Sequence, residues 1–280
     1  MDLNPLVSII VPTRNSSRTL EACLKSIKDQ TYNAIELIVV DNNSTDTTKE
    51  IGRKYTDKVF NFGPERTFQR NFGAKQASGA YLLMLDSDMV LSPSLVAEGV
   101  ERFEKEKEIG SLKITEESFG EGFWTKCKKL ERSLYIGIDW MNGSRFFRKE
   151  VFEQAGGYTT ESYNCEDWDL SQRAERVAAS ATMKSYIYHD EGRIYFFKNL
   201  KDKFYDTKDF GLYKDRETNR ELAKKQMSFL KRFGIFLSRR KKLFANPMLG
   251  VAMLFMKVFE FIFAGFGYIF GRLEKRFNKQ

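Results

Sequence analysis

The first half of the chain alternates short β-rich runs with helical patterns, and this alternation is the feature that most constrains the fold. Strands that alternate with helices in this order pair in parallel, with the helices packed on the faces of the sheet. The sequence therefore predicts an α/β fold with a mostly parallel sheet flanked by helices. The predicted strands are Val7–Val11, Ile35–Val40, a short run near Val59 and Tyr81–Leu85, and the predicted helices are Thr19–Asp29, Thr45–Tyr55, Thr67–Ala77 and Pro93–Lys105.

Polar loops follow three of these strands, at residues 12–15, 41–46 and 86–88. The carboxyl ends of parallel strands meet at one edge of a sheet, and open α/β sheets bind their ligands there. We expect the ligand site of this chain at that edge.

The loop Asp86-Ser87-Asp88 places two carboxylates directly after an apolar strand. Side chains two residues apart in an extended chain share a face, so Asp86 and Asp88 are expected to point the same way. Hard cations such as Mg²⁺ and Mn²⁺ prefer carboxylate oxygens and often share their coordination shell with phosphates. The pair is weak evidence by itself, because such pairs also cap helices and form turns.

The second half is less regular and ends in a basic, aromatic and then apolar tail. Basic residues alternate with aromatic ones between Arg193 and Leu243, and the apolar stretch Pro247–Phe270 is interrupted only by Lys257 and Glu260. Before the tail, the pattern predicts a helix at about Glu121–Tyr135, strands at Arg145–Arg148 and Met183–Tyr188, a helix from about Glu166, and the single histidine, His189, after the last strand.

Composition narrows the class of protein. A chain of 280 residues can bury a sizeable core, which suggests one catalytic domain and an appendage. The 46 Lys and Arg against 38 Asp and Glu suit nucleic acid, anionic lipid or phosphorylated substrates. The three cysteines show no disulfide or zinc spacing. The amino terminus lacks the pattern of a secretory signal, so the N-terminal part is expected in the cytoplasm.

Five motifs, taken in order, resemble those of glycosyltransferase family 2, whose members are inverting nucleotide-sugar transferases of the Rossmann-like GT-A fold. Their joint order is more diagnostic than any one motif, and they extend over roughly residues 5–190. The motifs are Val-Pro-Thr-Arg-Asn at 11–15, Val-Asp-Asn-Asn-Ser-Thr-Asp at 40–46, Gln-Arg-Asn-Phe-Gly-Ala at 69–74, Leu-Asp-Ser-Asp at 85–88 and Glu-Asp-Trp-Asp-Leu-Ser-Gln-Arg at 166–173.

The resemblance implies a nucleotide site at the first two loops, beside the acidic pair. Arg70 is expected near the nucleotide and the acidic pair, where a guanidinium can bridge a carboxylate and a phosphate. The alternatives stay open, since residues 41–44 can also form a turn and cap a helix, and Arg70 can be a surface arginine. The implied nucleotide-binding residues are Pro12, Thr13, Arg14, Asp41, Asn43, Arg70, Asp86 and Ser87.

The resemblance also implies a metal site, a general base and a sugar pocket. Asp86, Asp88 and His189 are the expected ligands of Mn²⁺ or Mg²⁺, although a lone histidine is more often structural. Asp167 is the implied general base, while acidic residues at a helix start can also serve the helix dipole. The residues expected along the donor sugar and acceptor are Asn142, Gly143, Glu166 and Trp168.

The apolar tail leaves three interpretations. Pro247–Phe270 is long enough to cross a bilayer, but Lys257 and Glu260 interrupt a clean span, although they can pair with each other. The two alternatives are an amphipathic helix that lies in the lipid interface and a helix packed against a partner chain. Some membrane members of the family, similar to dolichyl-phosphate sugar and cellulose synthases, carry such helices here. This chain lacks a Gln-x-x-Arg-Trp motif and the apolar length for a polymer pore.

The sequence thus predicts a catalytic domain at 1–192 and membrane-associated helices at 193–280. The expected reaction is metal-dependent, inverting transfer of a hexose from a UDP- or GDP-sugar to a hydroxyl of a lipid-carried acceptor, either a lipid phosphate or a lipid-linked glycan. The catalytic domain is expected to be cytoplasmic and held at the cell membrane by the C-terminal helices. The alternative is a sugar-nucleotide-binding scaffold subunit without turnover, and nucleic-acid binding lacks a recognised module.

Overall fold

The computed structural model describes residues 4–160, 164–215 and 220–277. Contacts among these residues group into two compact units. The first unit is built from 4–116, 142–160 and 166–190, and the second from 117–141, 164–165 and the C-terminal part from 191 onward.

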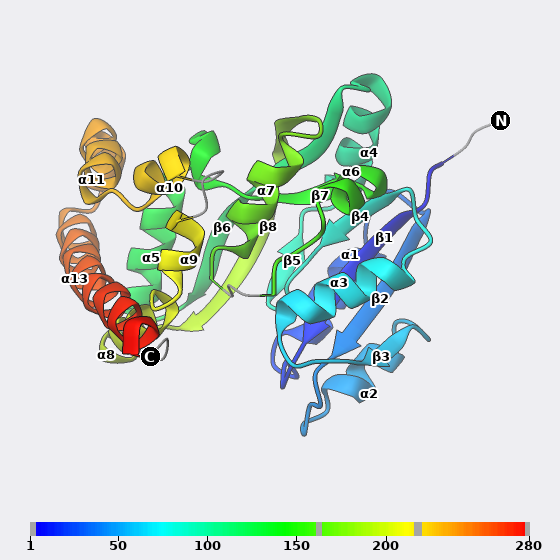
Figure 1. Ribbon diagram of the computed structural model, residues 1–280, viewed down its shortest axis with the longest axis horizontal. Coiled ribbons are helices and arrows are strands. Elements are labelled where there is room, and N and C mark those ends of the chain that lie inside the picture. The colour runs from blue at the N-terminus through cyan, green and yellow to red at the C-terminus, as the bar shows by residue number, and fades with distance from the viewer. Residues whose placement is uncertain (1–3, 161–163, 216–219, 278–280) are drawn as a thin grey trace. The chain divides into compact units, whose positions relative to one another are not determined.

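An eight-stranded sheet in the order β3-β2-β1-β4-β7-β6-β8-β5 forms the centre of the first unit, although the ends of β6 and β8 belong to the second (Figure 1). The first four strands pair in parallel, and β4–β7, β7–β6 and β5–β8 pair antiparallel. The predicted parallel sheet is confirmed, with an antiparallel extension that makes the whole sheet mixed. The strands are β1 (Val7–Thr13), β2 (Ile35–Asp41), β3 (Val59–Asn61), β4 (Tyr81–Met84), β5 (Met89–Leu91), β6 (Ile109–Glu121), β7 (Ser144–Arg148) and β8 (Ala179–Arg193).

Helices cover both faces of the parallel strands, because successive side chains of a buried strand point to opposite faces. In β1, Val7, Ile9 and Val11 join one apolar cluster with helices α1 and α4, whereas Ile10 joins another with α3, α6 and α7. Figure 1 shows α3 lying across β1 and β2. The helices of this unit are α1 (Leu20–Lys28), α2 (Thr48–Arg53), α3 (Arg66–Gln76), α4 (Leu95–Lys105), α6 (Lys149–Gln154) and α7 (Glu166–Ala174).

The sequence does not predict two strands of the antiparallel extension, β5 and β6, and a third strand, β8, is longer than expected. β5 has only three residues, too few to show an alternating pattern, and it is defined by pairing with β8 ninety to a hundred positions later. β6 was not predicted at all. β8 was expected to end before His189 but continues to Arg193, so that His189 lies within the strand, opposite Met89.

The second unit is helical and is built around the longest helix of the described chain, α13 (Pro247–Phe277). This helix packs along α8 and α5. An apolar cluster that includes Cys127, Leu134, Phe236 and Met256 lies between its helices. The other helices are α5 (Phe123–Ser133), the short 3₁₀ helix η1 (Asp139–Met141), α8 (Phe196–Asp206), α9 (Phe210–Asp215), α10 (Arg220–Gln226), α11 (Phe229–Ser238) and α12 (Arg240–Leu243).

Candidate active site

Two polar loops of the predicted site are joined at the carboxyl ends of β1 and β2. The parallel register sets Thr13 opposite Asp41, and Thr13 Oγ1 donates to Asp41 Oδ1 over 3.0 Å. Asp41 is fully buried and also accepts from the Ser44 amide at 2.8 Å and from its hydroxyl. Asp41 therefore shapes the turn at 41–44, and its role toward a nucleotide base stays a prediction.

The same loops are linked by residues in the left-handed backbone region. Asn15 and Asn43 have φ of 50° and 49°, a conformation that asparagine tolerates better than most residues. The Asn15 amide donates to Ser44 Oγ at 2.8 Å. Pro12 is buried in β1, whereas Arg14 and Asn43 are exposed at the rim of the strand ends. A rigid polar rim with an exposed guanidinium results.

The helix α3 carries Arg70 to the end of β4. Its neighbour Gln69 fixes the helix by donating from Nε2 to the Thr13 carbonyl at 2.9 Å. Arg70 is completely buried, forms an ion pair with Asp86, and lies over the Tyr158 ring at 4.9 Å. The alternative of a surface arginine is therefore excluded.

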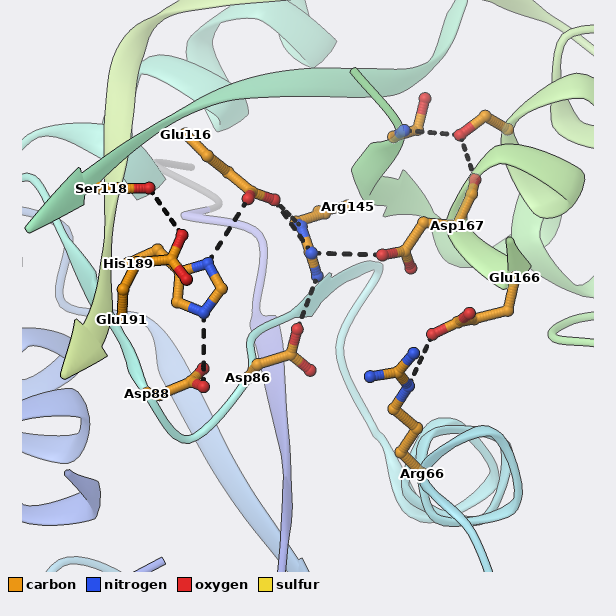
Figure 2. Close-up of polar contacts among 12 residues, drawn as sticks. Arg66, Asp86, Asp88, Glu116, Ser118, Arg145, Glu166, Asp167, His189 and Glu191 are labelled. Carbon is orange, nitrogen blue, oxygen red and sulfur yellow. Dashed lines mark hydrogen bonds and ion pairs between the residues drawn. The ribbon is translucent and has the colours of Figure 1, made fainter. Parts of the chain in front are cut away.

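Asp86 lies between two arginines. Besides Arg70, Arg145 on β7 places its Nη1 3.3 Å from Asp86 Oδ2, as Figure 2 shows. Burial alone would raise the pKa of Asp86, but the charges of Arg70 and Arg145 outweigh burial and hold that pKa well below its usual range. The carboxylate of Asp86 thus stays charged.

Asp167 lies close to Asp86 because the same two arginines hold it. Arg70 Nη1 is 3.2 Å from Asp167 Oδ1, and Arg145 Nη2 is 3.2 Å from Asp167 Oδ2. The two guanidinium groups therefore connect the acidic pair after β4 with the first turn of α7. Segments 80 residues apart in sequence meet at one point.

The backbone around Asp167 is held by small residues. Gly143 lies so close that an added Cβ would be 3.0 Å from the Asp167 Cβ. Ser171 Oγ accepts from the Ser144 amide at 2.6 Å and donates to the Asp167 carbonyl at 2.5 Å. Contacts with Gly143 and Ser144, at the start of β7, therefore fix the position of Asp167.

Glu166 shares Arg70 with Asp167 and also pairs with a further arginine, Arg66. It is buried and pairs with Arg66 Nε at 2.7 Å and with Arg70 Nη1 at 3.3 Å. Burial, together with the charge of Asp167, raises the pKa of Glu166, and the arginines only partly oppose this shift. Glu166 therefore contributes to the placement of Arg66 and Arg70.

Asp88 and His189 meet on the other side of Asp86. His189 Nε2 lies 3.3 Å from Asp88 Oδ2, and His189 Nδ1 lies 3.8 Å from Glu116 Oε2. The pairing of β5 with β8 produces this contact, since the Asp190 amide donates to the Asp88 carbonyl at 2.8 Å. The structure therefore brings Asp88 and His189 together, and their role as metal ligands stays a prediction.

These residues suit a divalent cation by the chemistry of their side chains, but not by the way those side chains are arranged. Among residues 4–160, 164–215 and 220–277, no group of three or more His, Cys, Asp or Glu side chains is arranged to hold a metal ion. Asp86 is engaged by arginines, but Asp88 Oδ1 is buried and has no hydrogen-bond partner in that part of the chain. Two carboxylates, one of them with an unpaired oxygen, and an imidazole are donors that Mn²⁺ and Mg²⁺ accept.

The remaining expected residues lie around the same strand ends. Ser87 Oγ donates to Ser16 Oγ at 2.8 Å. Asn142 Nδ2 is buried without a hydrogen-bond partner in the described chain. Trp168 is half-buried on α7. Buried polar atoms without partners beside a charged cluster are positions where a polar ligand can bind.

Two residues of this cluster were not among the predicted site residues. Arg145 contacts Asp86, Asp167 and Glu116, with 3.0 Å to Glu116 Oε1, and Glu116 lies between Arg145 and His189 in Figure 2. The signal in the sequence was an arginine beside Asn142-Gly143, but its importance depends on β7 pairing antiparallel with β4. That pairing joins strands about 60 residues apart and has no local signature.

Solved structures show which fold surrounds this cluster. The mannosyltransferase PcManGT from Pyrobaculum calidifontis, solved with GDP-Man and Mn²⁺, superposes with a TM-score of 0.63 at 16% identity over 99% of this chain and 88% of that chain. S. aureus TarS, residues 1–349, gives 0.59 at 19% identity over 96% and 92%. The fold is therefore the GT-A glycosyltransferase fold, as predicted.

Sequence comparison defines the family. The family model "Glycosyl transferase family 2" matches residues 8–162, more than half of the chain. The PGL/p-HBAD biosynthesis glycosyltransferase of Mycobacterium bovis is 30% identical over 198 residues, which are 65% of this chain and 75% of that protein. The chain belongs to glycosyltransferase family 2 and is a glycosyltransferase by homology.

Two further relatives match over a shorter segment. Glycosyltransferase AglE of Haloferax volcanii is 38% identical over 93 residues, covering 30% of this chain and 31% of AglE. The GalNAc(5)-diNAcBac-PP-undecaprenol β-1,3-glucosyltransferase of Campylobacter jejuni is 38% identical over 94 residues, covering 30% of each chain. The matched segment thus spans less than a third of these two relatives.

Proposed function

We propose that the chain is a metal-dependent, inverting glycosyltransferase that moves a hexose from a UDP- or GDP-sugar to a hydroxyl of a lipid-carried acceptor. The observation that carries this proposal is the convergence of Asp86 and Asp167 on the shared guanidinium groups of Arg70 and Arg145. A donor-binding carboxylate and a proton-accepting carboxylate must lie this close for one displacement to involve both.

Asp167 takes the role of general base. The acceptor oxygen attacks the anomeric carbon, its proton passes to Asp167, and the bond from that carbon to the diphosphate breaks, which inverts the anomeric centre. Both Asp167 oxygens are held by arginines at 3.2 Å, yet each carboxylate oxygen retains a further lone pair for the proton. The arginines thereby orient the base without blocking it.

Asp86, Asp88 and His189 would hold Mn²⁺ or Mg²⁺, which would neutralise negative charge on the departing diphosphate. Arg70 and Arg145 add two fixed positive charges beside Asp86. The solved structure of this fold with GDP-Man and Mn²⁺ supports a nucleotide sugar as the donor and a divalent cation as the cofactor of this site. The rim residues Thr13, Arg14, Asp41 and Asn43 would contact the nucleotide.

Two observations support a lipid-carried acceptor. The Campylobacter relative is named for an undecaprenol-linked glycan. In addition, residues 247–274 of α13 are long and apolar enough to cross a membrane, and an 18-residue window within them has a mean hydropathy of 1.9. We propose that the first 192 residues carry out transfer on the cytoplasmic side, and that residues 193–280 hold the chain at the cell membrane.

The test uses the full chain with a panel of UDP- and GDP-sugars, Mn²⁺ and a lipid extract. Release of nucleoside diphosphate and labelled lipid is expected with one donor, and chelation should abolish both. The matched control is Asp86→Asn/Asp88→Asn, which removes the acidic pair. Donor binding by wild type without diphosphate release under any combination would contradict the proposal and favour a non-catalytic scaffold.

A further inference from the structure

Between positions 248 and 271, helix α13 buries its charged side chains and exposes apolar ones. Lys257 and Glu260 are the charged residues between positions 248 and 271, and both are buried, with 4% and 2% exposure. They pair with each other, and Lys257 Nζ also lies 2.8 Å from Glu131 Oε1 on α5. Asn199 on α8 donates to Glu260 Oε1 at 2.7 Å. The charges therefore fasten α13 to its neighbours.

The opposite face of α13 is a continuous apolar stripe. The exposed positions recur every three or four residues, which is one face of a helix. The exposed fractions of these apolar side chains range from 36% to 68%, whereas a helix surface that faces water is normally polar. The stripe consists of Met248, Val251, Phe255, Val258, Ile262 and Phe266.

Protein covers the inner face of α13 along its length, so lipid cannot surround it. Near its C-terminal end, an added Cβ at Gly267 would lie 2.0 Å from the Phe204 carbonyl, and one at Gly271 would lie 2.2 Å from the Lys208 carbonyl. The contacting helix α8 exposes the charged residues Lys201 and Asp202. A perpendicular span would carry those charges into hydrocarbon, which is costly.

Charge indicates what covers the stripe. Residues 191–280 hold 21 Lys and Arg against 9 Asp and Glu, whereas residues 1–190 hold 25 against 29. The net positive charge of the protein therefore resides in its C-terminal part. Arg240, Lys241 and Lys242 are exposed immediately before α13, and Phe197 on α8 is 82% exposed. Basic clusters beside exposed aromatic and aliphatic side chains fit an anionic membrane surface.

We propose that α13 lies in the plane of an anionic membrane, with the stripe in the headgroup and acyl boundary and the charges Lys257 and Glu260 turned toward α5 and α8. This inference deepens the membrane association in the proposed function. It uses contacts within the second unit alone, and its test requires no sugar transfer, so either can fail without the other.

The experiment is flotation of the full chain with phosphatidylcholine vesicles, with or without phosphatidylglycerol. We expect strong flotation with phosphatidylglycerol and weaker flotation without it or at high salt. Val258→Asp should lower the bound fraction at least fivefold. The matched control is Val177→Asp, since Val177 is 38% exposed and Val258 36%, and it should float like wild type.

A second variant keeps the proposal testable if Val258→Asp fails to fold. Arg240→Glu/Lys241→Glu changes only exposed side chains, and it should lose binding to phosphatidylglycerol vesicles while keeping the wild-type melting temperature. Unchanged flotation of Val258→Asp would overturn the proposal. Wild-type protein that detergent releases from membranes, but alkaline carbonate does not, would also overturn it. A lipid-free dimer that Val258→Asp converts to a monomer, with flotation unchanged, would assign the stripe to a second copy instead.

Discussion

Arg145 Nη2 lies 3.2 Å from Asp167 Oδ2, while Nη1 of the same guanidinium lies 3.3 Å from Asp86 Oδ2. One side chain therefore sets the separation between the proposed base and a carboxylate of the donor site. A planar guanidinium can do this because its donors are fixed relative to one another.

Replacing this arginine should impair transfer more than binding. Arg145→Lys keeps the charge but loses the forked geometry, so that the ammonium cannot satisfy Asp86 and Asp167 together. We expect kcat to fall about 100-fold, as for other misplaced catalytic groups, with the donor dissociation constant changed less. Steady-state kinetics and calorimetry measure the two quantities. The control is Arg53→Lys on α2, and equal losses of kcat and of donor affinity would argue against the positioning role.

Gly143 should be intolerant of a methyl group. An alanine there would place its Cβ 3.0 Å from the Asp167 Cβ and 3.3 Å from the Asp167 backbone. Because backbone cannot move aside cheaply, we expect Gly143→Ala to cost about 1 to 2 kcal/mol of unfolding free energy and to reduce transfer. Denaturant unfolding gives the first quantity and product formation the second.

Gly234 supplies the matched control for this substitution. Nothing lies within 4 Å of a Cβ added at Gly234, which is in the interior of α11. Gly234→Ala should stabilise that helix slightly. Equal behaviour of the two variants would mean that the close approach of Gly143 to Asp167 is unimportant.

Acid should destabilise the first unit through Glu36. Burial alone would raise the pKa of this carboxyl, but the ion pair with Lys58 and hydrogen bonds from Ser8 and the Ser78 amide lower that pKa from 4.5 to about 2. A lowered folded-state pKa contributes stability above pH 4.5, and this stability disappears as pH falls toward 2.

Glu36→Gln tests this contribution. The variant should lose about 1 to 2 kcal/mol at neutral pH, less than the full pKa difference implies, because the ion-pair partner Lys58 is exposed to solvent. Its unfolding free energy should also fall less steeply between pH 4.5 and 2 than that of wild type. Parallel curves for the two proteins over this range would contradict the assignment.

The sequence was sufficient for the parallel half of the sheet and for the side chains at its edge. Short, nearly continuous apolar runs identify β1, β2 and β4, and the parallel register of β1 and β2 brings Thr13 and Asp41 together. The pair Lys257 and Glu260 was also readable, since residues three apart share a helix face. Each of these features depends on local spacing.

The missing features depend on contacts between distant segments. Arg145 matters because β7 pairs with β4, and Glu116 because β6 brings it to Arg145. Likewise, no local pattern predicts that Lys257 pairs with Glu131, or that the stripe from Met248 to Phe266 faces outward. Helix orientation is decided by the packing of the whole second unit.

The most direct test of the central claim is Asp167→Asn. The amide keeps the shape of the side chain but cannot take the acceptor proton. Transfer measured with radiolabelled donor should fall at least about 1,000-fold, while calorimetry should give a donor dissociation constant within about threefold of wild type. Transfer within about tenfold of wild type, or loss of donor binding together with transfer, would show that Asp167 is not the base.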